Sequence, residues 1–499
     1  MHPHNLRRLV GIGGVLLLMV LMVGSTVAAQ PSAPEMESQR VGPHRHSLTA
    51  NESLLFKQDE GRPGQLGASN TLTPTVFLPV VTREWPPILT RTPNDPYYTD
   101  GTQWNLDQIS GPAAWARNTG SASVIVAIVD TGVDTGHPDL AGKTVAGASF
   151  VPGAPTPADD NGHGTHCAGI AGAVTDNGVG VAGVSWGARI MPVKVLDELG
   201  SGYTSWIANG IRWAADNGAR AINLSLAGEG SSSTMQNAVN YAHGKGCLVV
   251  AAVGNCGDPS NYDCSTWNPI MYPAASPNVL GVGATGDLDE RAVYSEFNYS
   301  VDVTAPGGNP TSGGDTNPRH WIISTWLGHG YAQIAGTSQA APHVAGLAAL
   351  VWSVNPGLTP DQVQSVIQNG ADDLGPAGRD DEFGYGRINA ATTLGLAATT
   401  VQSAAGDTPA TAAGPLATGP VAANEFAPGV VLVKFKPGVS AAARQTALDA
   451  QQLTVLSQIP NLHILRVRVP AGQELATAQR LAGDPQVEYA ELDLVYRAQ

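Results

Sequence analysis

Two patterns of apolar residues alternate along the middle of the chain: continuous runs rich in β-branched residues, which predict buried strands, and runs with helical spacing. The continuous runs are 124–129, 189–195, 221–224 and 248–252. The helical runs are 205–217, 234–243 and 359–369. Because fully apolar strands need cover on both faces, residues 92–397 are predicted to form an α/β domain with helices on both faces of a parallel sheet.

A second, smaller unit is predicted at the C-terminal end. Residues 398–424 are largely Ala, Thr, Gly, Pro and Ser, the composition of a flexible linker. Beyond the linker, 425–499 regains apolar periodicity and predicts a strand, a helix, two strands, a helix and a strand. These elements are 430–435, 441–452, 455–459, 462–469, 474–481 and 487–494. The order β-α-β-β-α-β is the ferredoxin-like plan, so we expect a small α+β domain.

The N-terminal 29 residues have the layout of a secretory signal peptide. Two arginines precede an apolar run at 9–23, and small residues before Ala29 suit cleavage there. An uncleaved membrane anchor is the alternative, although the run is shorter than the ~20 residues that a spanning helix needs. Residues 30–91 are polar and rich in Pro, Ser and Gly, which predicts a mostly disordered leader. We therefore expect a secreted protein with no membrane attachment after processing.

Composition narrows the classes of partner. The chain has 26 basic and 41 acidic residues and a net charge of −15, without runs of Lys or Arg, so nucleic acid is a poor partner. Residues 92–397 alone carry 11 basic and 27 acidic residues, so the acidity belongs to the predicted α/β domain. Charged residues make up only 13% of the chain beside 59 Gly and 36 Pro, which indicates a turn-rich globular protein.

Three reactive side chains follow strands or begin a helix. Asp130 ends the first strand in an Asp-Thr-Gly sequence, His163 lies within N-G-H-G-T-H-C-A-G at 161–169, and Ser338 lies within G-T-S-Q-A-A-P-H-V-A-G at 336–346. Asp-Thr-Gly also marks aspartic proteases, but that class needs two carboxylates that share a proton, and we do not favour it. Asp, His, Ser is one of the known chain orders of a hydrolytic triad.

The chemistry of such a triad assigns a role to each residue. Ser338 would be the nucleophile, His163 the base that takes its proton, and Asp130 the carboxylate that orients the base. Ser338 begins a predicted helix, where backbone N–H groups favour developing negative charge, and Gly336 predicts a sharp turn before it. Asn255, directly after an apolar strand, could donate a hydrogen bond to the oxyanion; taken alone it would be a turn-forming residue.

The four cysteines are too few for a disulfide framework in a chain of this length. Cys167 and Cys247 are predicted to be buried core residues. Cys256 and Cys264 lie in a polar loop of a chain that we expect to be exported, which favours a disulfide between them. The H-x-x-H spacing that starts at His163 lacks the glutamate of an H-E-x-x-H zinc helix, so a metal site there is not favoured.

Residues 91–394 resemble the subtilisin-like serine proteases, because four motifs occur in the order of that family. The start, T-P-N-D-P-Y at 92–97, is similar to the thermitase branch. Gln339 departs from the family, which usually has Met after the nucleophile; we expect changed oxidation sensitivity and packing rather than loss of activity. The resemblance implies a subtilisin-like fold and a serine endopeptidase that acts on polypeptides of many sequences, and we expect a monomer.

The resemblance also implies a substrate channel and a structural calcium site. The channel edges would be Gly200, Ser201 and Gly202 on one side and Ser225, Leu226, Ala227 and Gly228 on the other. Ala227 stands where the family usually has Gly, which would narrow the channel rim. The calcium ligands would be the side chains of Asp95, Asp139 and Asn177 and the carbonyls of Thr175, Val179 and Val181. Without the resemblance, this segment would be a Gly-rich turn beside a solvated aspartate.

The C-terminal unit resembles the inhibitory propeptide domain of subtilases, through V-L-V-K-F-K-P-G at 431–438 and V-E-Y-A-E-L-D at 487–493. In that family the domain ordinarily precedes the protease, whereas here it follows. The resemblance implies that this domain folds or inhibits the enzyme in cis, with residues 496–499 lying against Ser338 and His163 as a product-like strand. The alternative is a catalytically silent binding protein or a trans-acting protease inhibitor.

Overall fold

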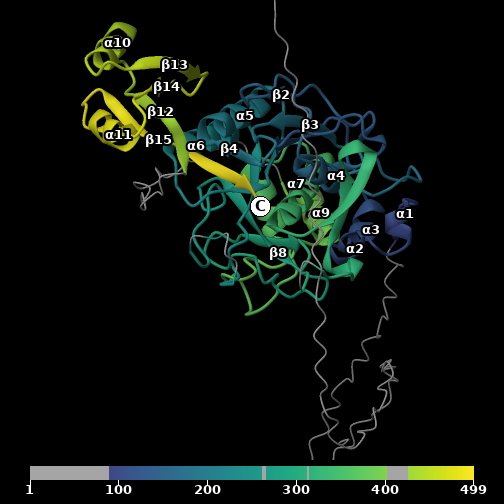
Figure 1. The fold of residues 1–499 in the computed structure, drawn as a ribbon. Helices are drawn as coiled ribbons and strands as arrows, with labels where there is room; N and C mark the ends of the chain where they lie inside the picture. The colour runs from purple at the N-terminus through teal and green to yellow at the C-terminus, as the bar shows by residue number, and fades with distance from the viewer. Residues whose placement is uncertain (1–88, 261–263, 265, 312–313, 402–424) are drawn as a thin grey trace, which may run out of the picture. The chain divides into compact units, whose positions relative to one another are not determined.

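The computed structural model describes residues 89–499 apart from 261–263, 265, 312–313 and 402–424 (Figure 1). All described residues belong to one compact unit, Arg83–Gln499. The predicted signal peptide, nearly all of the predicted leader and most of the predicted linker lie outside the described residues. Among the described residues, no helix combines the length and the apolar character needed to cross a membrane.

A seven-stranded parallel sheet forms the centre of the larger domain (Figure 1). In spatial order its strands are β2 (Ala148–Ser149), β3 (Arg189–Lys194), β1 (Ile125–Asp130), β5 (Ala221–Leu224), β7 (Leu248–Ala252), β8 (Val279–Thr285) and β9 (Val303–Pro306). The four strands predicted from continuous apolar runs are all in this sheet, within one residue at each end. The parallel sheet is therefore confirmed.

Helices cover both faces of the sheet, as predicted. Side chains of β1 alternate between two apolar clusters: Val126 and Ile128 lie in one, and Ala127 and Val129 lie in the other. The helices are α1 (Pro96–Thr99), α2 (Trp104–Gln108), α3 (Gly111–Trp115), α4 (His163–Gly172), α5 (Thr204–Asp216), α6 (Ser233–Gly244), α7 (Thr337–Val354), α8 (Pro360–Asn369) and α9 (Ala390–Thr399). The first cluster includes residues of α4 and α7, and the second includes residues of α5 and α6.

Two further features border the sheet. A hairpin of β10 (Ile322–Trp326) and β11 (Gly330–Ile334) packs against α4, so it helps to hold the helix that begins at His163. The helix α9 ends at Thr399, which places the first residues of the predicted linker in a helix. Alanine has a high helix propensity, and Ala397 is fully buried, so the helix continues beyond the predicted boundary.

The C-terminal unit has the predicted ferredoxin-like plan. Its elements are β12 (Phe426–Phe435), α10 (Ala441–Asp449), β13 (Thr454–Ile459), β14 (Ile464–Arg468), α11 (Glu474–Ala482) and β15 (Val487–Ala498). The strands pair antiparallel in the order β13-β14-β12-β15. Val431 and Val433 pack in a cluster with α10 and α11, whereas Leu432 and Leu492 join the cluster that contains α5 and α6.

The last strand is longer than predicted. The sequence predicts an end at Leu494, but β15 continues to Ala498 and pairs antiparallel with β4 (Ser201–Tyr203) and β6 (Leu226–Ala227). The extension pairs with strands of the larger domain rather than with the ferredoxin-like sheet, so the pattern of the C-terminal unit alone did not predict it. The two domains thus share one sheet through β15.

Candidate active site

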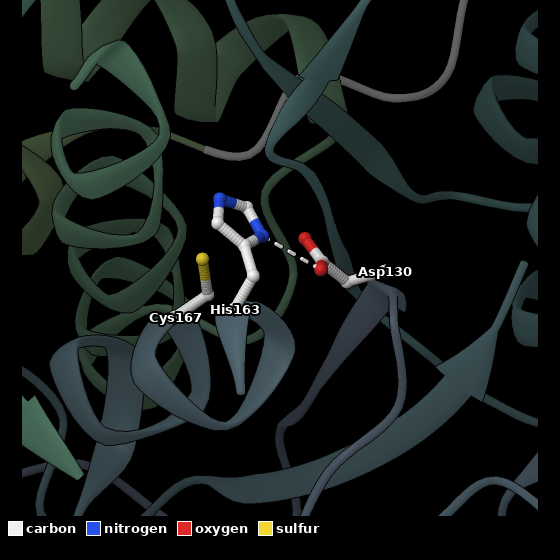
Figure 2. A group of neighbouring side chains, drawn as sticks. All are labelled: Asp130, His163 and Cys167. Atoms are coloured by element: carbon white, nitrogen blue, oxygen red, sulfur yellow. Dashed lines mark hydrogen bonds and ion pairs between the residues drawn. The ribbon is translucent and has the colours of Figure 1, made fainter. Parts of the chain in front are cut away.

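The end of β1 and the start of α4 bring Asp130 and His163 together (Figure 2). His163 Nδ1 lies 2.8 Å from Asp130 Oδ1, and Asp130 is fully buried. The backbone N–H of Thr131 donates to the same carboxylate oxygen at 2.7 Å. This arrangement places the Nδ1 proton in the hydrogen bond with Asp130 and leaves Nε2 as the atom that can accept a proton.

Opposing effects set the pKa of His163. Burial disfavours the imidazolium and lowers the pKa, whereas the charge of Asp130 and its hydrogen bond raise it. The carbonyl of Gln499, 3.4 Å from Nε2, adds to the upward effect. The net result is a pKa above the ordinary value of 6.5, so His163 is a stronger base than a free imidazole.

Ser338 is the second residue of α7 and is fully buried. Its hydroxyl donates to the carbonyl of Ser225 at 3.0 Å and accepts a hydrogen bond from the backbone N–H of Gln499 at 3.0 Å. Gln499 therefore contacts both predicted reactive groups, Ser338 Oγ through its N–H and His163 Nε2 through its carbonyl. In this arrangement the serine proton is directed toward Ser225 rather than toward the base.

The amide of Asn255 is oriented by Thr337, a residue that sequence analysis did not single out. Asn255 Oδ1 accepts hydrogen bonds from the Thr337 backbone N–H at 3.0 Å and from its hydroxyl at 2.9 Å, which fixes the orientation of the amide, with Nδ2 as its donor group. A Cβ on Gly336 would lie 3.1 Å from Asn255 Nδ2 and 3.0 Å from the Gln499 carbonyl oxygen. The predicted sharp turn at Gly336 is wrong, because its backbone is extended (φ 164°, ψ 165°); glycine is needed there for space.

The predicted alternatives at this site can be compared with the geometry. Asp-Thr-Gly recurs at 134–136, but Asp134 accepts from the N–H of Gly136, and Asp130 is paired with His163 rather than with a second carboxylate. Cys167 lies beside Asp130 and His163, with ligand atoms of the three within 4.8 Å of one another (Figure 2). Burial raises the pKa of the Cys167 thiol well above its ordinary value, which disfavours the thiolate that binds metals.

Residues 121–386 match the subtilase family, more than half of the chain. The chain belongs to the subtilase family. Thermitase of Thermoactinomyces vulgaris is 44% identical over 299 residues, which are 60% of this chain and 98% of thermitase. Subtilisin Savinase of Lederbergia lenta is 42% identical over 287 residues, 58% of this chain and 96% of that protein. The subtilase is therefore a subtilisin-like serine endopeptidase.

Two further comparisons extend this result. A solved protease structure from Pseudoalteromonas arctica aligns with a TM-score of 0.55 and 34% identity, over 62% of this chain and all of that chain. Residues 413–493 match the fervidolysin N-terminal prodomain. The predicted resemblance of the C-terminal unit to a subtilase propeptide is confirmed, and in this subtilase the prodomain-like region follows the protease instead of preceding it.

Every residue predicted to line the substrate channel lies beside the end of β15. On one edge the contacts are Gly200 with Ala498, Ser201 with Arg497 and Gly202 with Tyr496. On the other they are Ser225 with Gln499, Leu226 with Ala498, Ala227 with Arg497 and Gly228 with Val495. Tyr496 is fully buried and donates its hydroxyl to the carbonyl of Gly230 at 2.9 Å.

Two carboxylates of β15 cap helices of the subtilase domain. Asp493 accepts hydrogen bonds from the N–H and hydroxyl of Ser205, both at 2.8 Å, in the first turn of α5. Glu491 accepts from the N–H groups of Ser233 and Thr234, both at 2.8 Å, at the start of α6. Helix N-termini present unpaired N–H groups and a positive dipole end, so these carboxylates stabilise both helices and join the domains. Sequence analysis missed them.

A third acidic side chain, Asp159, supports the triad without touching His163. Its Oδ1 accepts from the hydroxyl of Thr131 at 2.8 Å, and its Oδ2 accepts from the N–H of Thr165 at 2.9 Å. The Thr131 hydroxyl in turn accepts from the N–H of Gly164 at 2.9 Å. Asp159 thereby ties the residue after Asp130 to the first turn of the helix that begins at His163.

The residues predicted to bind calcium lie together in a separate region. Asp139 accepts hydrogen bonds from the side-chain amide of Asn177 at 2.9 Å and from the N–H of Val181 at 2.8 Å. Asp95 accepts from the N–H of Asp176 at 2.8 Å, and its Oδ1 is buried without a hydrogen-bond partner among the described residues. Burial raises the pKa of both acids, that of Asp139 to about 6. Two buried acids with an unpaired oxygen fit a bound cation.

The remaining predicted residues are placed as follows. Cys256 and Cys264 form a disulfide, while Cys167 and Cys247 are free and buried. The Tyr272–Pro273 peptide bond is cis. In the predicted calcium segment, Thr175 accepts from the N–H of Gly183 through its hydroxyl, and Val179 is exposed.

Proposed function

We propose that this subtilase is a secreted endopeptidase that cleaves peptide bonds through an acyl-enzyme on Ser338 and that its C-terminal domain inhibits it in cis. The observation that carries the proposal is the place of Gln499, whose backbone contacts Ser338 Oγ and His163 Nε2 while its strand fills the channel. Reaction of the intact protein with a fluorophosphonate, read as a mass increase, tests it. A silent binding protein would give no adduct.

The residues support a two-stage reaction. When the channel is free, the Ser338 hydroxyl turns from Ser225 toward His163 Nε2, which takes its proton as the oxygen attacks the substrate carbonyl. His163 then passes that proton to the leaving amine, and an ester remains on Ser338. Water attacks the ester, losing a proton to His163, which returns it to Ser338 as the acid product leaves. Asn255 Nδ2 and the Ser338 N–H would stabilise the oxyanion in both stages.

The channel supports binding of an extended peptide through its backbone. β15 lies between β4 and β6 as an added antiparallel strand, and a substrate would take the same place. Hydrogen bonds to the backbone do not distinguish side chains, which supports broad specificity. The side chain with the most enclosed site is Tyr496, three residues before Gln499, so we expect aromatic residues to be favoured at that substrate position.

The same contacts support inhibition by the C-terminal domain. Its strand occupies the channel, and Glu491 and Asp493 anchor that strand on α6 and α5. Because the inhibitor and the channel belong to one chain, the effective concentration of the inhibitor at the channel is high. We propose that residues 92–397 are the catalytic domain and 425–499 the inhibitory domain.

Asp130→Asn is expected to lower kcat by about 10⁴-fold, the loss that the corresponding change causes in serine proteases with this triad. It also shifts the acid limb of the kcat/KM profile to lower pH. The neutral base is lost as pH falls through the pKa of His163, and Asp130 raises that pKa, so its removal lowers the pKa. Profiles from pH 4 to 9 with a chromogenic peptide measure both effects. Asp134→Asn, which leaves the His163 hydrogen bond intact, is the control. If the acid limb of the kcat/KM profile lies at the same pH in both variants, the role assigned to Asp130 is contradicted.

We propose a structural calcium ion held by Asp95, Asp139 and Asn177, with backbone carbonyls of Thr175, Val179 and Val181. The buried, unpaired Oδ1 of Asp95 and the upward pKa shifts of both acids support this site. A bound divalent cation would neutralise two acids that burial otherwise destabilises, and oxygen ligands are those that calcium prefers. Calcium would supply rigidity and no step of the reaction.

Chelation of calcium is expected to lower the Tm of the Ser338→Ala protein, which cannot digest itself. At free calcium 100-fold above Kd, binding contributes about 2.7 kcal/mol, or roughly 4 °C for a domain of about 300 residues. In Asp139→Asn the difference between calcium and chelator disappears, whereas Asp381→Asn, an exposed acid elsewhere, keeps it. A Tm that does not respond to chelator in the parent protein would refute the site.

We propose that the protein is exported, and the only basis for this proposal is the sequence of residues 1–29. N-terminal sequencing and the mass of the protein found outside the producing cell test it. Cleavage after Ala29, or at a later maturation site, supports export. An intact N-terminus retained in the cell would contradict it.

A further inference from the structure

A glutamate is buried beneath the loop that carries Asn255. Glu296, between β8 and β9, is fully buried. Its backbone N–H lies 3.4 Å from the carbonyl of Gly254, and its Oε1 accepts from the N–H of Cys256 at 2.9 Å. A Cβ on Gly254 would lie only 2.6 Å from either carboxyl oxygen. Glu296 therefore contacts the residue before Asn255 and the residue after it.

These contacts complement those made by Thr337. Thr337 fixes the side-chain oxygen of Asn255, and its hydroxyl also accepts from the N–H of Gly254 at 3.2 Å. Gly254 has φ 111°, a conformation that favours glycine, which lets the carboxyl group approach the backbone closely. Thr337 thus orients the amide of Asn255, and Glu296 holds the backbone from which that amide extends.

The surroundings of Glu296 favour its protonated form. Burial is the main effect and raises its pKa, the hydrogen bond from the Cys256 N–H and the charge of Arg291 oppose it, the charge of Glu229 adds to it, and the net pKa is about 8. The Arg291 guanidinium donates to the carbonyl of Ser295 at 2.6 Å and lies over the ring of Phe297, so its hydrogen bonds are directed elsewhere. Glu296 Oε2 has no hydrogen-bond partner among the described residues, and burial of a charge there would be costly.

We propose that Glu296 is a positioning residue for the oxyanion donor, acting on Asn255 through Gly254 and Cys256 in its protonated form only. Ionisation would place a charge beside the 254–256 backbone, with the N–H of Cys256 as its hydrogen-bond donor and Glu229 as a like charge nearby. Movement of the loop would relieve this charge and displace Asn255. Because the oxyanion exists only in the transition state, the loss falls on kcat and not on KM. This inference rests on the proposed role of Asn255.

The test compares full-length proteins at pH 6 to 10, with kcat per fluorophosphonate-titrated site of parent and variant compared at the same pH, so that the effect of docking of the C-terminal domain, common to both, cancels. Glu296→Gln keeps an oxygen acceptor for Cys256 and cannot ionise. We expect the parent and this variant to have equal kcat within about twofold at pH 6–7. Above the pKa of Glu296 the parent falls behind by about tenfold per pH unit, as the protonated fraction does, with KM unchanged.

Two further variants sharpen the result. Glu296→Ala removes the acceptor and is expected to lower kcat at every pH. Glu229→Gln removes a charge that raises the pKa of Glu296, so the alkaline loss moves to lower pH. The proposal is overturned if kcat of the parent and of Glu296→Gln has the same dependence on pH in the alkaline range. It is also overturned if Glu296→Gln loses activity only on substrates with Lys or Arg before the scissile bond, because Glu296 would then act on the substrate rather than on Asn255. Absence of hydrolysis and labelling in every protein would instead refute the proposed function.

Discussion

Ser338→Ala is expected to reduce kcat for peptide hydrolysis by about 10⁶-fold, the loss that removal of the nucleophile causes in subtilisin. The hydroxyl is the proposed nucleophile, and it accepts a hydrogen bond from Gln499, whose carbonyl lies near His163 Nε2. The variant keeps its fold, because the serine side chain contributes only the hydrogen bond to Ser225 and the one from Gln499. Rates of casein and peptide hydrolysis, with Tm as a check of folding, measure the effect.

Ser353→Ala is the matched control. Ser353 lies in the same helix, α7, and bonds to the carbonyl of Ala349 within that helix. We expect its activity to equal that of the parent. Retention of more than a trace of activity in Ser338→Ala, after exclusion of a contaminating protease, would show that the nucleophile lies elsewhere.

The double variant Glu491→Gln, Asp493→Asn is expected to activate the intact protein about 100-fold. Hydrogen bonds to a charged group contribute about 1.5–3 kcal/mol each, so loss of both charges at the helix N-termini weakens docking by about 3 kcal/mol. The cleft is then open for a larger fraction of the time. Initial rates of a fluorogenic peptide, per active site titrated after complete removal of the C-terminal domain, give the change.

Glu488→Gln is the control for this variant, because Glu488 lies on the same strand but pairs with Lys434 of its own domain. We expect the inhibition to be unchanged in it. If the double variant is inhibited as strongly as the parent, the two caps do not hold the domain. If the double variant also folds in lower yield, the C-terminal domain has a chaperone role as well. The rate per titrated active site would still measure docking.

Much of the fold could be predicted because most of its strands and helices have a recognisable local pattern of apolar residues. Continuous apolar runs gave the strands that lie at the centre of the parallel sheet, and helical spacing gave α5, α6 and α8. The β-α-β-β-α-β order of the C-terminal unit was likewise readable from alternation of short apolar segments. The triad was predictable because each member lies in a distinctive local sequence at the end of an element.

The residues that sequence analysis missed act through partners far away in the chain. Glu491 and Asp493 look like solvated charges, because the N–H groups that they accept from begin α5 and α6, over 250 residues earlier. Val495 and Tyr496 are strand-forming residues, but no local pattern could show that the end of this strand pairs with β4 and β6. Glu296 looks like an exposed loop residue until the fold brings it under Gly254. Thr337 could have been singled out from the sequence, because it directly precedes Ser338.

The net charges of the two domains do not explain why they bind each other. The catalytic domain is strongly acidic, and residues 398–499 have 7 basic and 8 acidic residues, so net charge does not attract one to the other. The docking contacts instead pair individual carboxylates with helix N-termini. Local dipoles rather than overall charge join the C-terminal domain to the larger domain.

The rate at which a fluorophosphonate labels Ser338 tests the central claim most directly. A site for a specific protease, placed within residues 402–424, allows the C-terminal domain to be cut from the folded protein and removed. We expect slow labelling of the intact protein, fast labelling after removal, and none in Ser338→Ala. Equal rates before and after removal would contradict inhibition in cis, and no labelling in either state would contradict the enzyme itself.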